Sequence, residues 1–255
     1  MMSCAETLFA EPTVSTPATA IETKPAAKPS QSCRDCAIRR ACAMQSERPA
    51  KREHLAALEL AHHRVKKGET LFRAGDRFTS LYVVRSGSFK KSMVLADGRE
   101  QITGFYFPGD AMALSAMHGG AHSSDAIALE DSAVCVVPSS VLESLSERVR
   151  SMGRHWHRML SAAIVRGGGA LVMLGSMTAE QRVAAFLLDL SDRWRGRGYS
   201  AVEFVLKMTR SEIGCYLGLK TETVSRVLQS MHRRGILDVH TSEIHILDLP
   251  SLILL

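Results

Sequence analysis

The sequence predicts an α+β protein that consists of an antiparallel β-roll or barrel, one long helix and a C-terminal winged helix-turn-helix. Three observations support this class. Short β-type runs alternate with turn residues from Glu69 onward, helical periodicity replaces them after Pro138, and a capped pair of helices lies near the C-terminus. The expected boundaries are a tail at 1–32, a cysteine loop with the roll at 33–144, the long helix at 145–177 and a small unit at 178–255.

Length and composition limit the possible classes of protein. The 255 residues fit one or two domains, and 45% hydrophobic with 23% charged residues is typical of a globular chain. No stretch reaches 18 consecutive apolar residues, and the N-terminus lacks a basic start followed by an apolar run. We therefore expect a cytoplasmic protein without a membrane span. A net charge of +6 favours a polyanionic partner.

The N-terminal half changes character twice. Residues 1–32 are rich in Pro, Ala, Thr, Ser and Lys and contain few large apolar groups, which predicts a disordered tail. Further along, turns containing Gly75, Gly87, Gly98 and Gly109 separate β-type runs such as SLYVVRSGSFKKSMVL. This spacing suits an antiparallel roll.

The long helix carries an apolar seam. Its members follow one another at spacings of four and three: Met152, Trp156, Met159, Ala163, Gly167, Ala170 and Leu174. A seam of this kind fits either the core of one subunit or a contact between two subunits. Three successive glycines, Gly167-Gly168-Gly169, weaken the helix, because each costs roughly 1 kcal/mol relative to Ala.

The last unit has the spacing of a helix-turn-helix. Thr209 and Glu212 form a capping box that predicts a helix start. That helix breaks at Gly218, and a second helix of about 13 residues begins near Thr221 and ends before Gly235. The alternating run ILDVHTSEIHIL then predicts a hairpin wing.

One face of the second helix is suited to reading bases. Glu222, Ser225 and Arg226 stand at i, i+3 and i+4, so they project together near the start of the helix. Arginine can hold guanine bidentately, and a carboxylate can accept from cytosine. Between residues 207 and 234, six Lys or Arg face two Glu, and we expect Arg210 and Thr221 to add DNA contacts. The alternative is that Glu222 and Arg226 form an ordinary surface pair.

Four of the six cysteines suggest a metal centre. Cys33, Cys36 and Cys42 form a C-x2-C-x5-C run, and Cys135 lies far away on a predicted strand. Four thiolates suit tetrahedral zinc or an iron-sulfur cluster, and three ligands from one loop favour the cluster. Alternatively, Cys135 is a buried core thiol. Cys4 and Cys215 are not expected to be ligands.

Taken together, residues 33 to about 247 resemble the oxygen-sensing fumarate and nitrate reduction (FNR) subfamily of the CRP/FNR transcription regulators. The resemblance rests on the four cysteines, on two sequence segments of the predicted roll, LFRAGDRFTSLYVVRSGSFK and REQITGF, and on ETVSR in the second helix. It implies a cyclic-nucleotide-binding-like β-roll, a long dimerisation helix and a winged helix-turn-helix. A dimer contact is then expected at Met152, Trp156, Met159, Ala163 and Ile164.

The resemblance also implies a cofactor and partners. An oxygen-labile 4Fe-4S cluster would be bound by the four cysteines, a homodimer would bind a palindromic TTGAT-like site in double-stranded DNA, and the turn at 96–99 would contact RNA polymerase. One departure is that GDAMALSAMHGGAHSSDAIAL contains no arginine for a phosphate, so no cyclic nucleotide is expected. The leading hypothesis is a regulator and not an enzyme. A receptor for another small ligand, a zinc-stabilised regulator and an iron-sulfur enzyme are the alternatives.

Overall fold

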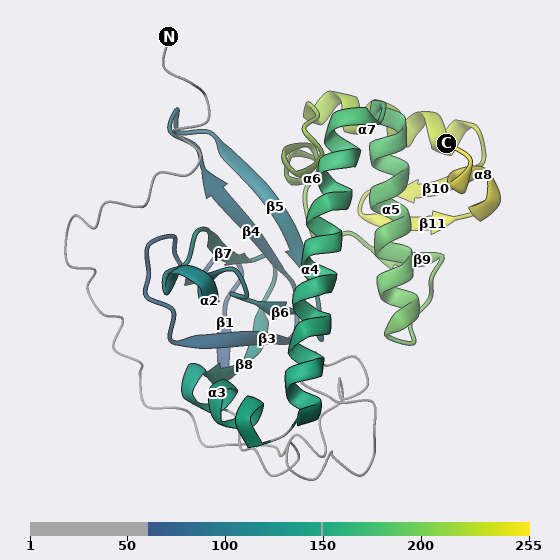
Figure 1. The fold of residues 1–255 in the computed structure, drawn as a ribbon. Coiled ribbons are helices and arrows are strands. Elements are labelled where there is room, and N and C mark those ends of the chain that lie inside the picture. Colours follow the sequence, from purple (N-terminus) through teal and green to yellow (C-terminus); the bar gives the residue numbers. More distant parts are fainter. Residues whose placement is uncertain (1–60, 149) are drawn as a thin grey trace.

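The computed structural model describes residues 61–148 and 150–255, together with their side chains except those of 145–156 and 158 (Figure 1). The strands of the N-terminal half are β1 (Ala61–Val65), β2 (Thr70–Phe72), β3 (Ser80–Ser86), β4 (Phe89–Val94), β5 (Glu100–Tyr106), β6 (Ala111–Met112), β7 (Asp125–Ala128) and β8 (Ser132–Pro138). A short helix, α2 (Ala116–Gly119), lies between β6 and β7.

These strands form the predicted antiparallel roll. One four-stranded sheet has the order β1-β8-β3-β6 and the other has the order β2-β7-β4-β5. Val84, Phe89 and Val134, which are fully buried, belong to the core between them. Gly87 shows why a glycine is needed at one turn: its φ is 78°, and an added Cβ would lie 2.1 Å from Oγ of Ser132.

Two helices follow the roll and lead to the C-terminal unit. The helix expected at 145–177 corresponds to the end of α3 (Ser139–Arg148) and to all of α4 (Arg150–Ser176). The segment Gly167-Gly168-Gly169 is helical within α4, so the three glycines do not interrupt it. In Figure 1, α4 stands between the roll and the C-terminal unit. Only Met177 and Thr178 separate α4 from helix α5 (Ala179–Gly196), which begins there because Thr178 and Gln181 form a capping box.

The C-terminal unit is the predicted winged helix-turn-helix. The capping box is confirmed: Glu212 N donates to Thr209 Oγ1 at 3.2 Å, and Thr209 N donates to Glu212 Oε2 at 2.8 Å. Its elements are α6 (Arg210–Leu217), α7 (Thr221–Arg233) and the wing strands β10 (Leu237–His240) and β11 (Glu243–Ile246). The structure adds β9 (Glu203–Val205), which pairs with β11, and α8 (Leu249–Ile253).

The roll and the C-terminal unit share an apolar cluster and several polar contacts. The cluster runs from Ile102 and Phe105 of β5 to buried side chains of α5, α6 and α7. Near the end of α5, the Asp110 carboxylate accepts from Arg193 Nη2 at 3.1 Å and from Arg197 Nη2 at 2.8 Å. A second polar contact joins β5 to α6. The C-terminal unit therefore packs directly against the roll, in addition to being connected to it through α4.

Candidate nucleic-acid interface and cysteine site

The face of α7 that was expected to read bases is open to solvent. Glu222 and Arg226 are exposed, Ser225 is half-buried, and Val224 is fully buried on the opposite side. Ser225 Oγ donates to the Thr221 carbonyl at 3.0 Å, so Thr221 and Ser225 are linked along the first turn. The apolar side of α7 thus fixes its orientation and leaves the predicted face available to a groove.

Electrostatics around α7 favour a polyanion. None of the ion pairs found in the described part of the chain joins Glu222 to Arg226, so the ordinary surface pair is not formed. Two of the six Lys and Arg side chains between residues 207 and 234 are paired with carboxylates: Lys207 lies 3.4 Å from Glu130, and Arg234 contacts Glu180. Arg226 and others on this unit remain exposed and can meet phosphates or bases.

Arg210 takes a position that its sequence role did not predict. Its Nη2 donates to the Thr241 carbonyl in the wing at 2.8 Å, and its Nη1 is buried and has no hydrogen-bond partner among the residues that the structure describes. Burial lowers the pKa of Arg210. Thr241 has a φ of 52°, a left-handed conformation at the tip of the wing. The arginine therefore braces the wing against the start of α6.

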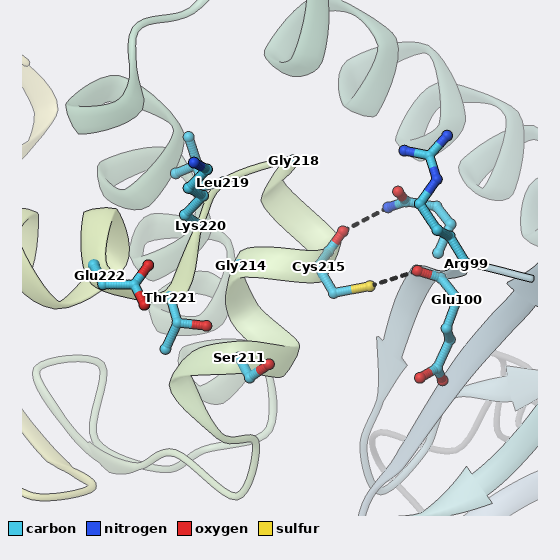
Figure 2. A pocket seen from close by; sticks show the side chains of 11 residues that line it. Arg99, Glu100, Ser211, Gly214, Cys215, Gly218, Leu219, Lys220, Thr221 and Glu222 are labelled. Atoms are coloured by element: carbon cyan, nitrogen blue, oxygen red, sulfur yellow. Dashed lines mark hydrogen bonds between the residues drawn. The ribbon is translucent and has the colours of Figure 1, made fainter.

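An open pocket lies between helices α6 and α7 on one side and the tip of the β4–β5 hairpin on the other (Figure 2). At its wall, Gln101 Nε2 donates to the Cys215 carbonyl at 2.6 Å and Ile102 N donates to Cys215 Sγ at 3.2 Å. The Cys215 thiol in turn donates to the Glu100 carbonyl at 3.1 Å. Nearby, Lys90 lies 3.3 Å from Glu212. These contacts dock α6 onto β5, a role that sequence analysis did not predict for Cys215.

Helix α4 exposes an apolar stripe. Leu160, Ile164 and Leu171 are 36%, 74% and 75% exposed, whereas Met159 and Ala163 are half-buried within the subunit. Residues 152 and 156 lie outside the described side chains. The segment Met159–Ser176 is long and apolar enough to cross a membrane, judged by length and composition alone, and only 6% of it is buried. A second subunit or a lipid phase would cover such a surface.

Cys135 lies on the outer side of its sheet. It is 6% exposed, and its register partners on the two neighbouring strands are His62 and Val83. Residues that pair across antiparallel strands point to the same face, whereas successive residues of one strand point to opposite faces. The adjacent Val134 belongs to the roll core, so Cys135 points away from that core. Cys135 is therefore buried without belonging to the interior of the roll.

Cationic and neutral polar groups lie beside Cys135. Arg85 Nη1 approaches the imidazole of His62, at 2.5 Å from Nδ1 and 2.9 Å from Nε2. Burial, followed by the charge of Arg85, lowers the pKa of His62. Within 61–148 and 150–255, no group of three or more potential metal ligands lies together. Cys33, Cys36 and Cys42 fall outside the described residues, so their meeting with Cys135 stays a prediction.

Comparisons with known proteins match both halves of the chain. A cyclic nucleotide-binding domain model matches residues 62–149, and a Crp-like helix-turn-helix domain model matches residues 181–255. The transcriptional regulatory protein Btr of Bordetella pertussis is 40% identical over 220 residues, which cover 86% of this chain and 91% of that protein. The fumarate and nitrate reduction regulatory protein of Vibrio cholerae is 39% identical over 234 residues, covering 89% and 94%. The chain belongs to the FNR subfamily of CRP/FNR transcription regulators.

A solved relative agrees with this assignment. The structure of FixK2 from Bradyrhizobium japonicum superposes with a TM-score of 0.72 at 32% identity, covering 78% of this chain and 98% of that one. Three predictions are thereby confirmed: the family, the fold class and the conclusion that this DNA-binding regulator is not an enzyme.

The roll of the regulator has an aromatic interior. His122 is 5% exposed and stacks on Phe72 with a centroid distance of 4.0 Å, and Phe72 stacks on Tyr82 at 5.6 Å. Burial lowers the pKa of His122, which favours a neutral ring in this stack. His122 comes from the stretch that lacks an arginine. Ring stacking therefore stabilises the interior at this point.

Proposed function

We propose that the regulator is an oxygen-responsive DNA-binding protein that acts in the cytoplasm as a homodimer. A 4Fe-4S cluster held by Cys33, Cys36, Cys42 and Cys135 would keep it active when oxygen is scarce. Relatives named for fumarate and nitrate reduction support this proposal at 39% identity over most of the chain. No cyclic nucleotide takes part in this proposal.

The position of Cys135 carries the cluster assignment. Strand β8 is paired on both sides, so it presents the thiol rigidly on a face outside the roll core. Arg85, which contacts His62, adds a cation to that face, and a nearby cation favours a thiolate. When bound, the cluster supplies oxygen-sensitive redox chemistry. One thiol from the roll and three from the C-x2-C-x5-C run complete the ligand set.

DNA recognition would use the open face of α7. Arg226 would hold a guanine, Glu222 the cytosine opposite, and Ser225 would contact a neighbouring thymine of a TTGAT-like half-site. Thr221, at the start of α7, and Arg210, through the wing, would support these contacts. The turn at 96–99, at the tip of the β4–β5 hairpin, would contact RNA polymerase.

The exposed stripe of α4 supports a homodimer. Water contact with Ile164 and Leu171 is unfavourable, and a second copy of the helix would remove it at roughly 25 cal/mol per Å² of apolar area buried. Two copies would place two reading helices on one face of the DNA.

The test is to purify the full chain without oxygen and to measure iron, acid-labile sulfide, zinc and operator binding before and after exposure to air. The proposal expects close to four irons and four sulfides per subunit and a loss of operator binding in air. A colourless protein with stoichiometric zinc would support the zinc-stabilised alternative. Cluster-free protein that binds operator fully would contradict cluster control.

A further inference from the structure

The first turn of α5 lies where two other helices end. Arg182, on this turn, donates hydrogen bonds from all three nitrogens of its guanidinium group. Nη2 reaches the Leu174 carbonyl at 2.7 Å, and Nε reaches the Met177 carbonyl at 3.0 Å. Nη1 reaches the Leu217 carbonyl, the last residue of α6, at 3.0 Å. One side chain thus joins the end of α4 to the end of the first helix of the helix-turn-helix.

These acceptors suit an arginine for electrostatic and geometric reasons. The last carbonyls of a helix lack intrahelical partners and carry the negative end of the helix dipole. A cation at that place is favourable, and charge-assisted hydrogen bonds are stronger than neutral ones. The planar guanidinium offers donors in fixed directions, whereas lysine offers a single ammonium. Arg182 therefore restrains the angles between α4, α5 and α6 as well as the distances between their ends.

Close packing at Gly218 restricts the same junction. This glycine ends α6 in the left-handed conformation, with a φ of 63°. A Cβ added there would lie 3.4 Å from Arg182 Nη1 and 3.4 Å from Leu174 Cδ2. The second reading helix is also tied to this turn, because Arg234, which follows α7, pairs with Glu180. Both helices of the reading unit are thus held to the start of α5.

We infer that Arg182 is the positioning residue that sets the orientation of the reading helices relative to α4. This inference rests on the proposed dimeric reading of a palindrome. Between α4 and α5 the chain passes only through Met177 and Thr178, and rotation about these bonds would swing α7 away from its groove. In a dimer joined along α4, a fixed rotation keeps the two reading helices about one DNA turn apart.

Arg182 then determines which half-site spacing is preferred, although it touches no base. The contacts of α6 with β5 hold the reading unit from the other side. Loss of Arg182 is therefore expected to loosen the orientation without unfolding the unit.

The experiment compares three DNA fragments with anaerobically purified full-length protein. They contain the palindrome at its native spacing, the palindrome with one base pair inserted at its centre, and an isolated half-site. Arg182→Met removes all three donors, and Arg182→Lys keeps the charge without the planar fork. Arg195→Met is the matched control, because Arg195 lies on the same helix and pairs only with Asp192 among the described ion pairs.

Arg182→Met is expected to bind the native spacing roughly tenfold more weakly, to bind the half-site unchanged and to lose most of the penalty for the inserted base pair. Arg182→Lys should fall between this variant and the wild type, and Arg195→Met should match the wild type.

Each contrary result has a separate meaning. A wild-type protein that is indifferent to spacing would refute the proposed dimeric reading. A spacing-selective wild type together with an equally selective Arg182→Met would overturn the role of Arg182. Equal losses on the half-site and on the palindrome would make Arg182 a stabilising residue of the helix-turn-helix only, which also overturns the inference. If Arg182→Met fails to fold, the same comparison is made with Arg182→Lys.

Discussion

Ser225 shows how a local hydrogen bond limits what a side chain can read. Its hydroxyl hydrogen is donated to the Thr221 carbonyl at 3.0 Å, which leaves only lone pairs for DNA. Thymine offers O4, an acceptor, to the major groove, whereas adenine and cytosine offer amino donors. In this rotamer Ser225 therefore suits an adenine or cytosine amino group, or contact with the thymine methyl group, and donation to thymine O4 would require the Thr221 bond to break.

Replacing Arg226 with Ala is expected to reduce operator affinity by about 1–3 kcal/mol and to relax preference at one guanine. The physical reason is the loss of a bidentate grip on O6 and N7. Binding to operators with each base substituted at that position measures the effect. Arg233→Ala removes an exposed cation at the other end of α7 and should weaken all sequences alike. Equal losses on specific and random DNA for Arg226→Ala would reduce Arg226 to a phosphate contact.

Replacing Cys135 with Ala is expected to abolish the cluster, because four irons then lack one protein thiolate. Iron and sulfide analysis of anaerobic protein measures the outcome. Cys4→Ala, which removes a thiol from the predicted tail, should keep full iron content. A Cys135→Ala protein with a complete cluster would remove Cys135 from the ligand set and return it to the alternative of a buried thiol.

At the scale of elements, the helix-turn-helix was predictable because its signals are local. Thr209, Glu212 and Gly218 specify where α6 begins and ends, whatever lies around them. Strand β9 could not be predicted in the same way, because its three residues gain their hydrogen bonds from β11, far along the chain. The bracing role of Arg210 could not be predicted from the sequence either, because its partner, the Thr241 carbonyl, lies 31 residues further along the chain.

The apolar seam of α4 illustrates a second limit. Periodicity located the helix, but the helix has two adjacent apolar stripes, and only packing decides which of them faces inward. In the structure Met159 and Ala163 are half-buried, and Ile164 with Leu171 faces solvent. Similarly, the meeting of Asp110 with Arg193 and Arg197 joins residues more than 80 positions apart. Sequence spacing carries no information about such a contact.

Replacing Ile164 with Asp is expected to dissociate the dimer, because a charge would have to be buried at the apolar contact. Sedimentation of cluster-loaded protein measures the mass. Ile253→Asp is the control, since Ile253 is an exposed apolar residue of α8, 62% accessible, and should leave the mass unchanged. A dimer that survives Ile164→Asp would place the subunit contact elsewhere.

Replacing Gly168 with Ala is expected to stabilise α4 by roughly 0.5–1 kcal/mol. Gly168 is helical, and no atom of the described residues lies within 4 Å of an added Cβ, so the substitution introduces no clash with this part of the subunit. Thermal unfolding should show the gain, and sedimentation of cluster-free protein should show a tighter dimer. Gly218→Ala is the contrast, because its φ of 63° makes Ala unfavourable there. Unchanged stability in Gly168→Ala would mean that the glycines do not limit the helix.

At the scale of the whole molecule, two routes lead from the roll to the reading helices. The first is α4, which would convert the state of the cluster into dimerisation. The second bypasses α4: Asp110 holds the far end of α5, and β5 holds α6 through Cys215. If air simply converted dimers to monomers, the first route would suffice. If a permanent dimer were reoriented, the second route would be needed.

The variant Asp110→Asn separates these routes. Asp110 accepts from the backbone of Phe107 at 2.9 Å as well as from Arg193 and Arg197, and the amide keeps its shape but loses the charge that attracts the two arginines. Each weakened charge-assisted bond costs on the order of 1 kcal/mol. The control, Asp189→Asn, removes the partner of Arg193 on α5 itself and leaves the roll untouched.

We expect Asp110→Asn to keep its iron content and its mass while the ratio of operator affinities before and after air falls several-fold. Sedimentation decides how that ratio arises. If air halves the mass of the wild type and Asp110→Asn keeps the full ratio, α4 alone transmits the signal. If the mass is constant and the ratio collapses, the clamp between the roll and α5 is the element that the cluster moves.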